Sequence, residues 1–238
     1  MTRFVILGAS RGLGAAFNAG LPAAGDVAWL VSRTRPELDL PDGARRLWVQ
    51  ADLALPGAAD ALAEALYGQP VDVLLYNAGI WETDAFGAEY DFARVPPDEN
   101  ERVIVVNLTA AIRCIQKLLP NLRQSAHGKL ILIGSTSGLE NARAPEVAYG
   151  ASKFGLRGAA HALREHLRRD GVAVTVINPG SLATDVPFSA GAAPALKKHG
   201  RSAIPLTDLV ALVKCLIHLS PASCVKEIDW PAMDDPAA

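Results

Sequence analysis

Short runs of apolar residues recur along the chain, and a glycine or a small polar residue follows most of them. The runs cover residues 3–7, 26–32, 46–51, 71–76, 129–134, 172–177 and 225–230. Their length is typical of strands buried on both faces of a parallel sheet. Residues 58–67, 98–121, 149–169 and 207–217 instead favour helices. This alternation predicts an α/β fold, a three-layer Rossmann-type doubly wound sheet of about seven mainly parallel strands with helices on both faces.

Three segments fit neither pattern. Residues 33–45 contain two prolines and no helical stripe, so this crossover is expected to be mostly loop. Residues 80–97 form an aromatic, acidic loop, and residues 185–205, rich in alanine, glycine and proline, are expected to be a mobile substrate lid. Because no linker and no internal repeat is present, the chain is predicted to be a single domain over residues 1–238.

Composition narrows the function classes. A net charge of −2 with interspersed signs gives no electrostatic footprint for nucleic acid or for an anionic membrane. No apolar run approaches the length of a membrane span, and the N-terminus does not read as a signal peptide. Cys114, Cys215 and Cys224 lack metal-ligand spacing, as do the dispersed histidines. We therefore expect reduced thiols, a cytoplasmic protein, and no metal, nucleic-acid or membrane partner.

A glycine-rich turn follows the first strand. Gly8, Gly12 and Gly14 precede a helix-capable segment, and strand, turn and helix in this order place backbone N–H groups against a pyrophosphate. The spacing is G-x-x-x-G-x-G and not the G-x-G-x-x-G of the standard dinucleotide fingerprint. The position of the turn, more than its spacing, indicates a nucleotide.

The end of the second strand indicates which nucleotide. Ser32 and Arg33 stand where an NAD-binding unit carries an acidic residue for the ribose hydroxyls. An arginine can bind a 2′-phosphate through two hydrogen bonds, and Arg11 in the glycine turn offers a second positive charge. The pair favours NADP(H) over NAD(H). The alternative is two ordinary solvent-facing arginines.

The segment from Ser135 to Lys153 carries the candidate chemistry. Tyr149 and Lys153 are four residues apart at the start of a helix, so they lie on one face. A cation near a phenol lowers its pKa, which makes Tyr149 a candidate proton donor or acceptor, and Ser135 at the preceding strand end can bind the same reacting oxygen. Taken alone, the motif also fits an ordinary surface tyrosine and lysine. Asn107 lies among apolar residues, where an amide is expensive unless it is hydrogen-bonded; a satisfied core asparagine is the alternative.

With these pieces in order, the chain resembles the short-chain dehydrogenase/reductase family over nearly its full length. The matching features are the glycine turn, Asp52-Leu53, Asn77-Ala78-Gly79, Asn107, Ser135 with Tyr149-x-x-x-Lys153, and Pro179-Gly180 with Thr184. The resemblance implies a substrate-orienting Ser135, a general acid/base Tyr149, a ribose-binding Lys153 and a proton-relay Asn107 that fixes a water and a helix distortion. It implies cofactor contacts from Gly8, Ser10, Gly12, Leu13, Gly14, Asp52, Leu53, Asn77, Gly79, Tyr149, Lys153, Pro179, Gly180, Leu182 and Thr184; we add Arg11, Ser32, Arg33 and Ala78.

The chain departs from the family pattern in three places. Leu7 replaces a frequent threonine before the first glycine. Tyr149 follows Ser135 by one residue more than is usual, so a bulge is expected at 139–147, and Thr136 or Ser137 can compete for the serine role. We prefer Ser135, because Ile-Gly-Ser-x-x-Gly is a frequent family form of this strand end. The short second crossover is expected to expose the adenine site.

The implied function is an NADP(H)-dependent oxidoreductase that interconverts a carbonyl and an alcohol by hydride transfer. The alternative is a sensor or scaffold that binds the cofactor without catalysis; isomerase or dehydratase chemistry is disfavoured because no extended C-terminal substrate domain is present. The expected partner is a small-molecule carbonyl or alcohol, preferably apolar. Lys197, Lys198 and Arg201 offer an anion site, or simply solvated charges. The resemblance further suggests a homodimer or homotetramer built through residues 98–121 and 149–169.

Overall fold

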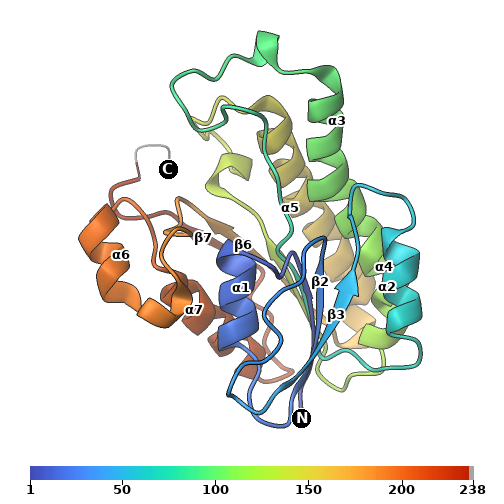
Figure 1. Cartoon of the computed structure of the whole chain (residues 1–238). Coiled ribbons are helices and arrows are strands. Elements are labelled where there is room, and N and C mark those ends of the chain that lie inside the picture. The colour runs from blue at the N-terminus through green and yellow to red at the C-terminus, as the bar shows by residue number, and fades with distance from the viewer. Residues whose placement is uncertain (236–238) are drawn as a thin grey trace.

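Seven parallel strands form the sheet at the centre of the computed structural model, which describes residues 1–235 (Figure 1). The strand order is β3-β2-β1-β4-β5-β6-β7, and each neighbouring pair of these strands runs parallel. The order reverses between β1 and β4, where a doubly wound sheet opens a ligand crevice. The predicted fold class is confirmed. The strands are β1 Arg3–Leu7, β2 Val27–Ser32, β3 Arg45–Gln50, β4 Val73–Tyr76, β5 Lys129–Ile133, β6 Ala173–Pro179 and β7 Glu227–Trp230.

Helices cover both faces of the sheet (Figure 1). One buried cluster lies beneath α2, α4 and α5, and a second lies beneath α1 and α7. Because the five inner strands are buried on both sides, their sequences are nearly continuous apolar runs and do not alternate between apolar and polar residues. The helices are α1 Gly12–Gly20, α2 Ala58–Ala65, α3 Pro97–Ile104, α4 Ala110–Leu122, α5 Val147–Leu167, α6 Ala192–His199 and α7 Leu206–His218.

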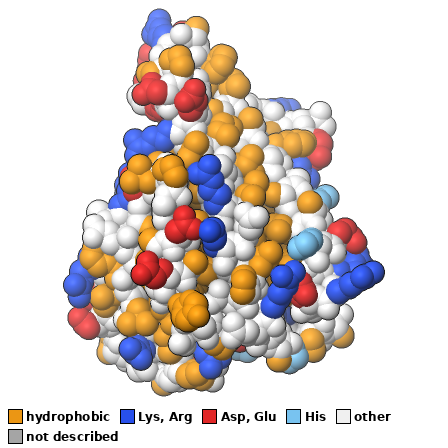
Figure 2. Space-filling model, turned by 90° about the vertical axis from the view of Figure 1, so that its right-hand side faces the viewer, with side chains coloured by type: hydrophobic (Ala, Val, Ile, Leu, Met, Phe, Trp, Pro, Cys, Tyr) orange, Lys and Arg blue, Asp and Glu red, His pale blue; other side chains and the backbone are white. Residues whose placement is uncertain are grey.

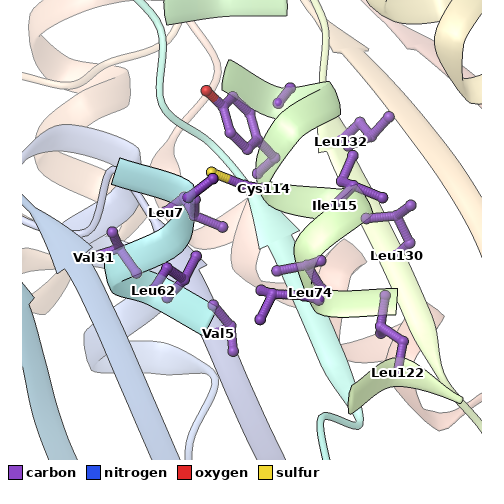
Figure 3. Packing of buried hydrophobic residues seen from close by; sticks show 14 of the residues in the cluster. Val5, Leu7, Val31, Leu62, Leu74, Cys114, Ile115, Leu122, Leu130 and Leu132 are labelled. Carbon is purple, nitrogen blue, oxygen red and sulfur yellow. The ribbon is translucent and has the colours of Figure 1, made fainter. Parts of the chain in front are cut away.

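The first cluster joins the sheet to α2 and α4. Figure 3 shows Leu7 and Leu74 from neighbouring strands, Leu62 from α2, and Cys114 and Ile115 from α4 meeting in one layer. Each of these side chains is at most 1% exposed. This layer fixes the position of β1 and β4, whose carboxyl ends border the crevice.

The helix expected over residues 98–121 is interrupted. A π-helical turn, Val105–Thr109, separates α3 from α4 without breaking the continuous helical path. α4 ends at Leu122, one residue beyond the predicted end at 121, and it contains Pro120 in its last turn. A proline in the last turn costs little more than one backbone hydrogen bond, so the helix tolerates it there.

By its length and mean composition, the continuous helix Pro97–Leu122 could cross a membrane, although polar residues interrupt its apolar runs. Many of its apolar side chains, including Ala111, Ile115 and Leu118, are buried in the first cluster. A helix that packs on a sheet can therefore have the composition of a membrane-spanning helix.

Two of the segments that fit neither pattern are the β2–β3 crossover and residues 185–205. The β2–β3 crossover contains no helix, as expected. Residues 185–205, predicted to be a mobile lid and not a strand or a long helix, contain the short helix α6. Asp185 binds Lys198 (2.6 Å) and His199 (2.8 Å), and Ala183, Val186, Ala195 and Ala203 form a small core of their own. The mobility of this segment stays a prediction.

Candidate active site

The glycine turn after β1 lies against the end of β4. Gly8 has φ +82°, a left-handed conformation that favours glycine, and a Cβ there would approach the Cα of Ala78 to 2.7 Å. The side chain of Asn77 donates to the Gly8 carbonyl (3.1 Å), and a Cβ on Gly14 would overlap that oxygen. Two motifs that are far apart in sequence are thus brought together by backbone contacts that require glycine.

The first turn of α1 has the features of an anion site. Arg11 precedes it with extended backbone, no side chain caps its N–H groups, and no acidic residue lies in it. A Cβ on Gly12 would lie 3.6 Å from the side chain of Thr184, so the loop after β6 borders the same turn. Uncapped N–H groups at a helix start bind phosphate. These residues fit a dinucleotide pyrophosphate, and the buried Leu13 has only its backbone to offer.

Arg33 lies where the sequence places the cofactor's adenosine side. It is exposed and, within residues 1–235, takes part in no ion pair. It borders a cavity of about 540 Å³ together with Ile80, Trp81 and Arg102. The neighbouring Ser32 is buried, and its hydroxyl donates to the carbonyl of Thr34 (2.7 Å), so its side chain shapes the turn.

The remaining predicted cofactor residues occupy strand ends. Asp52 accepts from the N–H of Ala54 (3.0 Å) and so fixes the turn after β3, while Leu53 is buried in the core. Gly180, directly after β6, donates its N–H to the carbonyl of Trp230 (2.9 Å). Leu182 forms an isolated parallel bridge with Ile204 at the end of the 185–205 segment.

Tyr149, Lys153 and Ser135 converge from α5 and β5. The ammonium of Lys153 lies 5.6 Å from the ring centroid of Tyr149 and donates to the carbonyl of Ile133 (2.9 Å). Ser135, two residues beyond Ile133, lies close enough to Tyr149 to lower the pKa of its phenol, and its hydroxyl accepts from the N–H of Ser137 (3.1 Å). The preference for Ser135 over Thr136 and Ser137 as the substrate-orienting hydroxyl stays a prediction.

Asn107 lies in the π-helical turn and is fully buried. Its amide oxygen accepts from the N–H of Ile80 (2.8 Å), and its NH₂ group donates to the carbonyl of Ile80 (2.8 Å) and to the hydroxyl of Ser152 (2.9 Å). The amide is therefore satisfied, which removes the cost of burying it. These bonds tie the loop after β4 to α5 next to Lys153.

The electrostatics of the site differ from the expectation that Lys153 lowers the pKa of Tyr149. Burial raises the pKa of Tyr149, and the negative charges of Glu146 and Glu82 raise it further, while Ser135 lowers it. Burial also lowers the pKa of Lys153 from 10.5 to about 8. The physical reason is that the ammonium points to the Ile133 carbonyl, whereas the phenol is enclosed by aromatic rings and two carboxylates.

Comparison with known proteins identifies the family. A family model described as short chain dehydrogenase matches residues 2–193. The chain belongs to the short-chain dehydrogenase family.

Two reductases and one solved structure are similar to this chain. The 3-oxoacyl-[acyl-carrier-protein] reductase MabA of Mycobacterium tuberculosis is 32% identical over 184 residues, which is 76% of this chain and 70% of that protein. The rhamnolipids biosynthesis 3-oxoacyl-[acyl-carrier-protein] reductase of Pseudomonas aeruginosa is 33% identical over 189 residues, 74% of this chain and 71% of that one. The crystal structure of an alcohol dehydrogenase from Thermococcus sibiricus, complexed with 5-hydroxy-NADP, has a TM-score of 0.80 at 21% identity and covers 98% of this chain and 97% of its own.

An aromatic wall lines the site of this short-chain dehydrogenase. The Phe86 and Trp81 rings meet the Tyr149 ring edge-on, with centroids 5.2 and 6.4 Å away. Phe86 and Trp81 also contact each other and are about half exposed. The loop after β4 therefore places an apolar surface beside the phenol of Tyr149.

Three residues at the site of this short-chain dehydrogenase were not predicted from the sequence. Glu82 and Glu146 are buried beside Tyr149, and Arg102 on α3 shares the cavity of Arg33. No periodicity marks the two glutamates, because one lies in an irregular loop and the other directly before α5. Arg102 lies in a polar stretch of α3, where a charged side chain usually faces solvent.

Proposed function

We propose that the protein is an NADP(H)-dependent oxidoreductase that interconverts a ketone or aldehyde and an alcohol, with Tyr149 as the general acid or base. The arrangement of Ser135, Tyr149 and Lys153 at the carboxyl end of β5 carries this proposal. Family membership supports oxidoreductase chemistry, and the reductases among the relatives support the reducing direction.

NADPH, when bound, supplies a hydride to the carbonyl carbon. The residues of the chain hold the carbonyl oxygen and its proton. Because Ser135 lies close to the phenol of Tyr149, one substrate oxygen can accept from both hydroxyls. Tyr149 gives its proton to that oxygen, and both hydroxyls stabilise the negative charge that develops on it.

Lys153 has two roles in this proposal. It binds the nicotinamide ribose, and it helps to return a proton to Tyr149 after each turnover. An ammonium whose pKa is about 8 can release and regain a proton close to neutral pH. Asn107, which ties α5 to the loop after β4, is proposed to hold the relay to solvent in place.

The cofactor preference rests on Arg33 and Arg11. Both are exposed at the crevice, and a guanidinium binds a 2′-phosphate more strongly than a ribose hydroxyl. The pyrophosphate is assigned to the turn from Gly8 to Gly14, and the nicotinamide to the loop from Pro179 to Thr184.

A substrate panel tests the function. Neutral aliphatic and aryl ketones and aldehydes are incubated with the protein and NADPH, with NADH as the comparison, and the loss of reduced-cofactor absorbance is followed. We expect turnover of apolar carbonyls with a preference for NADPH. NADPH binding without turnover of any carbonyl or alcohol would instead favour the alternative, a sensor or scaffold.

The assembly is proposed to be a homodimer or homotetramer of single-domain, cytoplasmic subunits, built through the faces of α4 and α5. Ile112 and Phe154 on these helices are exposed although both are large and apolar. Figure 2 shows hydrophobic side chains gathered among charged ones on the side of the molecule that carries α4. Sedimentation equilibrium of the protein and of Phe154→Glu tests this, with a shift toward monomer expected for the variant.

A further inference from the structure

Two glutamates with unsatisfied oxygens lie at the start of α5. Glu82 is 1% exposed and Glu146 is 3% exposed. Within residues 1–235, one carboxylate oxygen of each makes no hydrogen bond. Burying a carboxylate is costly unless its interactions repay the loss of solvent, so this pair calls for an explanation.

Glu82 caps α5 from outside the helix. One carboxylate oxygen accepts from the backbone N–H groups of Ala148 (2.8 Å) and Tyr149 (3.1 Å), and no side chain from the N-cap residue serves this turn. These are N–H groups that a helix cannot satisfy within itself. One of them belongs to Tyr149, so the carboxylate fixes the backbone of the proton donor directly.

Glu146 and Tyr90 complete the connection between the loop and the helix. The Glu146 carboxylate accepts from the N–H of Phe86 (2.7 Å), and the Tyr90 hydroxyl accepts from the N–H of Val147 (3.2 Å). Phe86 has φ +63°, a left-handed conformation that a non-glycine residue keeps only when its surroundings hold it. The ring that packs against Tyr149 is thus held by a buried charge.

We propose that Glu82 is a positioning residue for Tyr149: its buried carboxylate orders the start of α5 through hydrogen bonds to the backbone N–H groups of Ala148 and Tyr149, and it places a negative charge next to the residue that donates the proton. This inference rests on the proposed function. The groups that face the phenol are Lys153 and Ser135 from α5 and the end of β5, Glu146 from the residue before α5, and Glu82 and Tyr90 from the loop after β4.

The direction of the charge effect follows from electrostatics. A negative charge beside a phenol disfavours the phenolate, and both glutamates raise the pKa of Tyr149 in this way. Reduction requires the protonated phenol, whereas alcohol oxidation requires the phenolate. Without the charge of Glu82, reduction should fail at a lower pH and oxidation should begin at a lower pH.

Three variants separate charge from shape. Glu82→Gln keeps an oxygen that can accept both N–H groups but removes the charge, and Glu82→Ala removes both. Asp91→Asn is the control, because Asp91 accepts from the backbone N–H of Ala93 (3.0 Å) and so caps a short helical turn elsewhere in the same loop. The rate of NADPH-dependent reduction of a neutral ketone is measured against pH for each variant.

We expect Glu82→Gln to keep kcat at pH 7 within about threefold of the unmodified protein while its alkaline limb moves to lower pH by at least about half a unit. Glu82→Ala should lose about tenfold or more in kcat, and Asp91→Asn should match the unmodified protein in both respects. A Glu82→Gln profile that superimposes on that of the unmodified protein would overturn the charge role, whether or not Glu82→Ala folds. An unchanged kcat in a folded Glu82→Ala would overturn the positioning role.

A second readout does not need turnover. The ultraviolet absorbance of phenolate is titrated with pH in the protein and in Tyr149→Phe, and the difference isolates Tyr149. Its midpoint should be lower in Glu82→Gln than in the unmodified protein, and an equal midpoint contradicts the inference. A protein that reduces no carbonyl but shows the shifted midpoint would refute the proposed function and leave the role of Glu82 intact.

Discussion

The ammonium of Lys153 donates a hydrogen bond to the backbone carbonyl of Ile133, 2.9 Å away. Ile133 ends β5, the strand that leads into Ser135, and Lys153 lies one turn after Tyr149 on α5. The bond therefore locks together the two elements that supply the hydroxyls of the site. Lys153 is 4% exposed, so it makes this contact at the cost of burying a charge.

Lys153→Met tests that cost. The folded protein lowers the pKa of Lys153 from 10.5 to about 8, so below pH 8 the burial penalty is fully present. Between pH 8 and 10.5 the unfolded state holds more protons, and the free energy of unfolding should rise with pH by up to about 3 kcal/mol relative to the variant. Urea denaturation of both proteins at pH 7 and pH 10 measures the difference. The prediction is wrong if the free energy of unfolding of both proteins changes equally between the two pH values. The kcat of Lys153→Met should also fall at least about 100-fold.

Arg33→Asp should shift the cofactor preference. A carboxylate in place of the guanidinium repels the 2′-phosphate, so the Kd for NADPH should rise more than about tenfold while the Kd for NADH changes less than about threefold. Arg45→Asp is the matched control, because it makes the same charge change at the amino end of β3, whereas Arg33 follows the carboxyl end of the neighbouring β2. An unchanged ratio of the two Kd values in Arg33→Asp would refute the role of Arg33.

Asn107→Ala should cost both stability and activity. It leaves the N–H and carbonyl of Ile80 without their partner, which predicts a loss of about 2–4 kcal/mol in the free energy of unfolding. Asn121 is the control, because its buried amide also bonds the backbone, at the carbonyls of Leu66 and Gln69, away from the site. Asn121→Ala should lose stability but keep kcat. Equal losses of kcat in the two variants, measured where both remain folded, would show that Asn107 has only a structural role.

The three cysteines should react in two classes. Cys114 is 1% exposed, and burial raises its pKa to about 12, whereas Cys215 and Cys224 are exposed. The thiolate is the reactive form, so a thiol reagent at pH 7 should modify two groups rapidly and the third only on unfolding. Three equally fast groups under native conditions would mean that the cluster around Cys114 opens readily.

The strands and the residues at their ends follow from sequence because parallel strands are apolar throughout and end in turns with special residues. Gly8 and Gly14 could also be predicted from the sequence, because close backbone contacts leave no room for a side chain at these positions. The helix α6 and the raised pKa of Tyr149 could not be predicted from the sequence. Each depends on contacts between distant segments, such as Asp185 with His199 or Glu82 with the first turn of α5.

Turnover of Tyr149→Phe with NADPH and the best carbonyl of the panel is the most direct measurement. The substitution removes one hydroxyl and leaves the ring among Phe86 and Trp81, so NADPH should bind within about threefold of the unmodified affinity. Tyr67→Phe, at a residue 88% exposed, controls for the loss of a phenol hydroxyl elsewhere. We predict that Tyr149→Phe loses at least about 99% of kcat while Tyr67→Phe loses none. A kcat for Tyr149→Phe within about tenfold of the unmodified protein would contradict the assignment of Tyr149 as the proton donor.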